Sequence, residues 1–161
     1  MTARDNHVLP THDLPLLLAG AGISTPAAQA AVQAGLQVLQ DFMRTFNARD
    51  AQAWAAVMNY PHVRLAGDQV IVWDDAAAYA AANDLTPLAD TGWAYSQWDW
   101  IRAVQADATK VHFALQFTRY DAQHQAQQSF EALYVITLKD GHWGVQSRSS
   151  YAGILAPGAA F

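Results

Sequence analysis

Two ionisable side chains on one short predicted strand are the first candidates for chemistry in this sequence. His62 and Arg64 stand two residues apart, directly after Tyr60-Pro61, and alternation along a strand places both on the same face. An imidazole titrates near neutral pH and can take up or release a proton. His62 is therefore a candidate base, or else a histidine that is hydrogen-bonded where the strand begins.

A second set of ionisable side chains lies on later strands. His112 shares a strand face with Ala114 and Gln116, and such a face is exposed to solvent, lines a polar pocket or contacts a partner subunit. Glu131 stands among apolar residues, where a carboxylate needs exposure or a nearby cation. Arg148 could supply that cation, because a guanidinium binds a carboxylate through two hydrogen bonds. The candidate catalytic residues are His62, His112 and Arg148.

Other kinds of chemistry lack the residues or the spacing that they need. The sequence has no cysteine, which removes disulfides, thiolate metal sites, iron–sulfur clusters and cysteine nucleophiles. The histidines of the predicted domain show no HxH or HxxxH spacing. Three serines, Ser147, Ser149 and Ser150, lie in a strand and not in a Gly-x-Ser-x-Gly turn. Six aspartates fall at predicted caps and turns: Asp74, Asp75, Asp84, Asp90, Asp121 and Asp140. We therefore expect neither a metal nor a cofactor.

Aromatic side chains are numerous, with six Trp, six Tyr and six Phe. Trp and Tyr carry N–H or O–H groups that need partners when buried, and a pocket wall is one place where they occur. Four rings between Trp93 and Trp100 differ in parity, so this strand has rings on both faces or contains a bulge. The rings form either a core with a subunit interface or a wall against which a ligand stacks. The candidate pocket residues are Trp54, Tyr60, Arg64, Trp98, Glu131 and Tyr134.

Two helices are predicted to open the domain. Thr25 is a good N-cap and Pro26 suits the first helical position. Apolar residues then recur at steps of three and four up to Phe46, which predicts one helix ending near residue 47. A second helix begins after Asp50 and ends before Tyr60-Pro61, because the residue before a proline disfavours helical geometry.

Strands dominate the rest of the chain. Segments 62–66 and 69–73 predict a hairpin around Gly67-Asp68, and Asp74 or Asp75 caps a short alanine-rich helix that ends near Asn83. Longer strands are predicted over residues 93–106, 109–120, 127–138 and 142–152. Turn residues between them indicate antiparallel neighbours. Helices first and long strands after them favour the α+β class, with the helices on one face of a curved sheet.

This order of elements resembles the nuclear transport factor 2-like superfamily, which includes ketosteroid isomerase and the SnoaL-like proteins. Residues 138–145, Leu-Lys-Asp-Gly-His-Trp-Gly-Val, are similar to a hairpin of that superfamily, and 42–57 are similar to its first helix pair. Over about residues 30–152, the resemblance implies a cone-shaped, cystatin-like fold. Its N-terminal helices pack on a strongly curved, mixed, mainly antiparallel sheet. The resemblance also implies a deep apolar cavity and a homodimer formed through the sheet.

The sequence departs from the isomerase branch of this superfamily at one position. In that branch the general base is an acid near the end of the first strand, but no Asp or Glu occurs from Pro61 to Gly67. The first hypothesis is therefore a homodimer that binds a small hydrophobic molecule. The second is a cofactor-free isomerase, dehydratase or epoxide hydrolase with a histidine base. A third is a purely structural partner subunit, which would have a flat apolar sheet and no cavity.

Composition sets the outer limits of these hypotheses. The chain has 161 residues, of which 52% are hydrophobic and 14% charged. This length fits one folded domain, and this composition excludes intrinsic disorder. A net charge of −5 without a basic run argues against nucleic acid as a partner. No apolar stretch approaches the ~20 residues of a membrane span, and we expect a cytoplasmic protein. We expect a domain over 25–155, after an extension (1–24) and before a tail (156–161).

Overall fold

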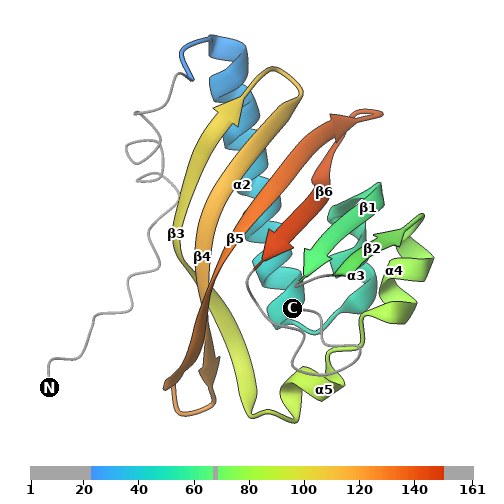
Figure 1. Cartoon of the computed structure of the whole chain (residues 1–161), viewed down its shortest axis with the longest axis vertical. Helices are drawn as coiled ribbons and strands as arrows, with labels where there is room; N and C mark the ends of the chain where they lie inside the picture. Colours follow the sequence, from blue (N-terminus) through green and yellow to red (C-terminus); the bar gives the residue numbers. More distant parts are fainter. Residues whose placement is uncertain (1–22, 67–68, 151–161) are drawn as a thin grey trace, which may run out of the picture.

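The computed structural model describes residues 23–66 and 69–150. The predicted tail and the Gly67-Asp68 turn lie outside the described residues, as does the predicted extension apart from Ile23 and Ser24. Within the described ranges, helices and strands follow one another as Figure 1 shows. They are α2 (Pro26–Asn47), α3 (Ala51–Ala56), β1 (Met58–Ala66), β2 (Gln69–Trp73), α4 (Ala76–Ala82), α5 (Thr86–Ala89), β3 (Trp93–Ala106), β4 (Lys110–Asp121), β5 (Ala126–Lys139) and β6 (His142–Ser150).

The strands form one mixed sheet in the order β2-β1-β6-β5-β4-β3. β1 and β6 are parallel, whereas the other neighbours are antiparallel. Predicted turn residues join the long strands: Asp140 and Gly141 have φ values of 51° and 79°, the left-handed conformation of a tight hairpin. Helices followed by a mixed, mainly antiparallel sheet confirm the predicted α+β class.

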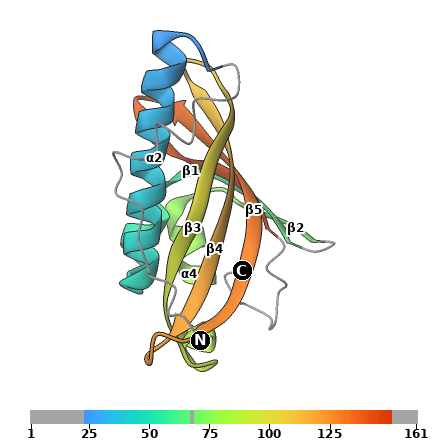
Figure 2. The ribbon, with the colours of Figure 1, turned by 90° about the vertical axis from the view of Figure 1, so that its left-hand side faces the viewer.

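Helix α2 covers one face of the sheet (Figure 2), and it contacts β3, β4, β5 and β6. The predicted N-cap is confirmed, because Thr25 Oγ1 accepts a hydrogen bond of 3.1 Å from the Ala28 backbone N–H. Gly35 faces β4, where an added Cβ would lie 2.6 Å from Cε2 of Phe113. The absence of a side chain at Gly35 therefore allows the helix to approach the sheet closely.

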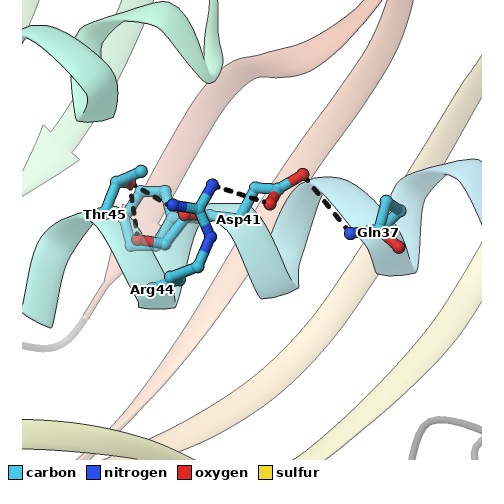
Figure 3. A network of polar contacts seen from close by, with 5 residues as sticks. Gln37, Asp41, Arg44 and Thr45 are labelled. Carbon is cyan, nitrogen blue, oxygen red and sulfur yellow. Dashed lines mark hydrogen bonds and ion pairs between the residues drawn. The ribbon is translucent and has the colours of Figure 1, made fainter.

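A polar network lies on α2 (Figure 3). The Asp41 carboxylate accepts hydrogen bonds from Arg44 Nη2 at 3.0 Å and from Gln37 Nε2 at 3.4 Å. The Thr45 hydroxyl donates to the Asp41 backbone carbonyl at 2.8 Å. An exposed ion pair of this kind contributes only about 0.5 kcal/mol, so the apolar side of α2, and not this network, holds the helix to the sheet.

The two faces of the sheet differ in burial. Strand residues buried beneath the helices define what we call the inner face, and the alternating residues define the outer face. On β3, Trp93 is buried and Trp98 packs against Phe42, whereas Trp100 Nε1 donates to Gln116 Oε1 on the outer face. Register shifts separate Trp93 from Tyr95 and Trp98 from Trp100. The strand therefore has both features that its sequence suggested, rings on both faces and bulges.

The close approach at Gly35 predicts the effect of one added methyl group. The Gly35→Ala variant should gain up to about 1 kcal/mol of helix propensity, but it should lose roughly 1–3 kcal/mol by overpacking against the buried Phe113 ring. We therefore expect net destabilisation in urea unfolding. Gln33→Ala, on the exposed side of α2, is the control. A Gly35→Ala variant more stable than the wild type would contradict this packing.

Candidate ligand-binding site on the inner face

Arg148 connects strands and helices at the inner face. It lies on β6 and is 2% exposed. Its Nε donates to His62 Nε2 on β1 at 3.2 Å, and its Nη2 donates to the Tyr79 hydroxyl on α4 at 2.9 Å. The guanidinium also lies 5.4 Å from the ring centroid of Phe42 and 5.6 Å from that of Trp54, within range of cation–π attraction. Arg148 thus links β1 and β6 with α2, α3 and α4.

His62 uses both ring nitrogens in this arrangement. Its Nδ1 lies 2.8 Å from the Val145 carbonyl oxygen, which can only accept, so Nδ1 carries the hydrogen. Nε2 is then the acceptor for Arg148. Burial, followed by the positive charge of Arg148, lowers the pKa of His62 to about 3. The imidazole is therefore neutral at physiological pH and holds Arg148 in place.

Two more arginines lie on the inner face. Arg64 on β1 is the Cα partner of Arg148 across the parallel strands, and burial, followed by the charge of Arg148, lowers the pKa of Arg64 to about 10. Arg119 on β4 lies over the ring of Phe130 at 4.7 Å and contributes to the same lowering. Burial lowers the pKa of Arg119 itself to about 10. This interior therefore destabilises the positive charges that it contains.

Three small side chains lie beside the arginine pair. Ala66, Ser150 and Ala132 are Cα partners across β1, β6 and β5, two residues beyond Arg64 and Arg148 along their strands. All three are buried, and we call them the small-residue row. Ser150 Oγ is buried without a hydrogen-bond partner among the described residues. At this place beside Arg64 and Arg148, none of β1, β6 and β5 carries a large side chain on the inner face.

The structure brings most of the predicted site residues together on the inner face. Trp54 packs edge-on against Tyr79, and Tyr134 is the Cα partner of Arg148. Tyr60 is half-buried, and its hydroxyl donates to the Ala55 carbonyl at 2.6 Å. The connected predicted residues are Trp54, Tyr60, His62, Arg64, Trp98, Tyr134 and Arg148.

His112 and Glu131 lie on the outer face, away from that cluster. His112 Nδ1 is 3.0 Å from Gln105 Oε1, and Glu131 is exposed. The expected pairing of Glu131 with Arg148 is wrong. Tyr134, not Glu131, is opposite Arg148, and its parity on β5 places Glu131 on the other face of the sheet.

Sequence reasoning missed two members of the cluster. Tyr79 is the single large side chain in α4, within Ala-Ala-Ala-Tyr-Ala-Ala-Ala, and it is fully buried. A lone ring in an alanine helix was a usable signal, because it is the only residue there able to fill a core. Arg119 has the parity of Phe113 and Phe117 on β4, which also predicts the inner face.

Within residues 23–66 and 69–150, no helix has the length and apolar character to cross a membrane. In the same part of the chain, no three His, Asp or Glu side chains are grouped as metal ligands would be.

Comparison with known proteins identifies the fold. No family model and no curated protein matches the sequence. Among solved structures, a nuclear transport factor 2-like protein with a cystatin-like fold from Novosphingobium aromaticivorans matches with a TM-score of 0.61 and 8% identity, over 76% of this chain and 82% of that one. A Nostoc punctiforme protein of unknown function with a cystatin-like fold matches with a TM-score of 0.62 and 10% identity, over 83% and 96%.

A third solved structure, Aln2 from a Streptomyces species, matches with a TM-score of 0.61 and 18% identity, over 80% of this chain and 93% of that one. At these identities the matches establish the fold and leave the activity open. The chain has the nuclear transport factor 2-like, or cystatin-like, fold, as its sequence predicted.

The low pKa of His62 predicts a stability that depends on pH. Its pKa of about 3 in the folded protein lies below the ordinary 6.5, so the unfolded chain binds more protons between these values and stability falls as pH falls. From pH 6.5 to about pH 5, this amounts to roughly 1.5 kcal/mol. Urea unfolding at pH 6.5 and at pH 5 measures this loss of stability. Between the same two pH values, the His62→Gln variant should lose roughly 1.5 kcal/mol less stability than the wild type. An equal pH dependence of both proteins would contradict the assignment.

Proposed function

We propose that the domain binds a small hydrophobic molecule at the inner face, above the small-residue row and beside Arg64 and Arg148. The observation that carries this proposal is the position of that row, bounded by aromatic rings and a few buried polar groups. Ligand sites are typically apolar and aromatic, with a small number of placed polar groups that orient the ligand. Buried guanidiniums are a costly way to stabilise a core, which favours a binding role.

A histidine-based enzyme has less support than binding. Both nitrogens of His62 are engaged, and its pKa is about 3, so taking a proton from a substrate would first require breaking the hydrogen bond with Arg148. His112 lies on the outer face beside Gln105. His62 is better explained as a positioning residue for Arg148.

We also propose that two copies of the chain pair through the outer face. Leu65, Ser149, Leu133 and Ala114 form a row across four strands, and Leu65 and Leu133 are 45% and 43% exposed. The next row is Val63, Ser147, Val135 and His112. Mostly small and apolar rows permit close packing of two sheets, and a second copy presents the same rows in a symmetric dimer.

Filling the space above the small-residue row should prevent binding. Nile red, a neutral hydrophobic dye, is the probe, and its fluorescence reports binding. We expect Ala132→Phe to weaken dye binding by about tenfold or more, because the new ring occupies the ligand volume. Ala126→Phe, at the exposed start of the same strand, should bind like the wild type. Wild-type dye binding that Ala132→Phe leaves unchanged, in a folded protein, would contradict the proposed location.

A charge in the outer rows should separate the two copies. Leu133→Glu places a carboxylate where the partner's apolar row would lie, and burying it unpaired is unfavourable. Sedimentation equilibrium should find a dimer for the wild type and a monomer for Leu133→Glu, with unchanged circular dichroism. Gln37→Glu on the exposed side of α2 is the control. A monomeric wild type would refute the dimer.

A further inference from the structure

We propose that the ligand of the inner face is a hydrophobic monocarboxylic acid, with its carboxylate bound by Arg64, Arg148 and the Ser150 hydroxyl. The proposal rests on the proposed function, since it names the chemical class of the molecule that the same site would take. Its basis is the placement of three hydrogen-bond donors on one face of two neighbouring strands.

The strand register brings these donors together. Arg64 and Arg148 are Cα partners on the parallel strands β1 and β6, and neighbouring strands lie about 4.8 Å apart. Ser150 follows Arg148 by two residues and is likewise buried on the inner face. A carboxylate accepts about four hydrogen bonds through its two oxygens, so one group can meet both guanidiniums and the hydroxyl.

Ser150 gives an observation that is independent of the arginines. Its residue is 8% exposed, and its Oγ is buried with no hydrogen-bond partner among residues 23–66 and 69–150. Leaving a buried hydroxyl without a hydrogen bond is unfavourable. A ligand oxygen beside the arginine pair would accept a hydrogen bond from this hydroxyl.

Charge favours an acid over a neutral ligand. Burial, the charge of Arg148 and the charge of Arg119 all disfavour the charged form of Arg64. A carboxylate brought between Arg64 and Arg148 would stabilise both cations in a region where screening by water is weak. An amide or alcohol of the same shape would supply no such charge.

The site is also arranged before any ligand arrives. His62 and Tyr79 each accept a hydrogen bond from Arg148 and so fix the plane of its guanidinium. A fixed donor loses less conformational entropy on binding. Phe130 is the next inner-face residue of β5 beyond Ala132, so the apolar part of the acid would lie along the small-residue row toward that ring.

A matched pair of ligands tests directly whether the negative charge of the carboxylate contributes to binding. Isothermal titration with 2-naphthoic acid and with its neutral primary amide, 2-naphthamide, compares molecules that differ at one group. We expect the acid to bind at least about tenfold more tightly than the amide, the effect of one charge-assisted interaction. Arg64→Met and Ser150→Ala should each weaken acid binding and reduce this preference. Arg102→Met, which removes an exposed cation from β3, should leave it unchanged.

The outcomes separate this inference from the proposed function. Equal binding of acid and amide would overturn the acid assignment while leaving the hydrophobic site intact. Binding of neither probe to the wild type would contradict both proposals. An acid preference that survives Arg64→Met and Ser150→Ala would also overturn the assignment. If circular dichroism shows that Arg64→Met is unfolded, Ser150→Ala decides alone, because it removes only one oxygen atom.

Discussion

The buried charge of Arg148 must be stabilised both by the sheet and by the helices that cover it. The arrangement of the surrounding elements follows from that need. A buried guanidinium requires acceptors in fixed positions, because water cannot supply them. His62 supplies one acceptor from the neighbouring strand β1, and Tyr79 supplies another from helix α4. Rings of α2 and α3 face the same cation. One side chain thereby ties the sheet to the helices that cover it.

The same requirement explains why His62 is a supporting residue. A histidine beside a buried cation is driven to the neutral form, and here its remaining N–H is bound to the Val145 carbonyl. The neutral ring can then accept from Arg148 over the whole physiological pH range. Arg64 lies beside Arg148 across the parallel strands, and burial together with the charge of Arg148 lowers its pKa. An interior that holds cations together in this way is suited to an anion.

Local structure was largely predictable from the sequence, because its signals are local. Thr25, Asp50 and Asp75 cap helices as their positions suggested, and turn residues placed the long strands almost to the residue. The site was harder, since it depends on strand register. A displacement of one residue reverses the face of every side chain, so Glu131 was wrongly paired with Arg148. The parallel pairing of β1 with β6, which joins Arg64 to Arg148, has no local signal.

A crystal structure of the protein with 2-naphthoate is the most direct measurement of the central claim. We expect the carboxylate to lie within hydrogen-bond distance of the Arg64 and Arg148 guanidiniums and of Ser150 Oγ, with the naphthalene ring above Ala132. A naphthoate bound elsewhere, or one on the inner face with its carboxylate turned away from both arginines, would contradict the assignment of this interior as an acid-binding site.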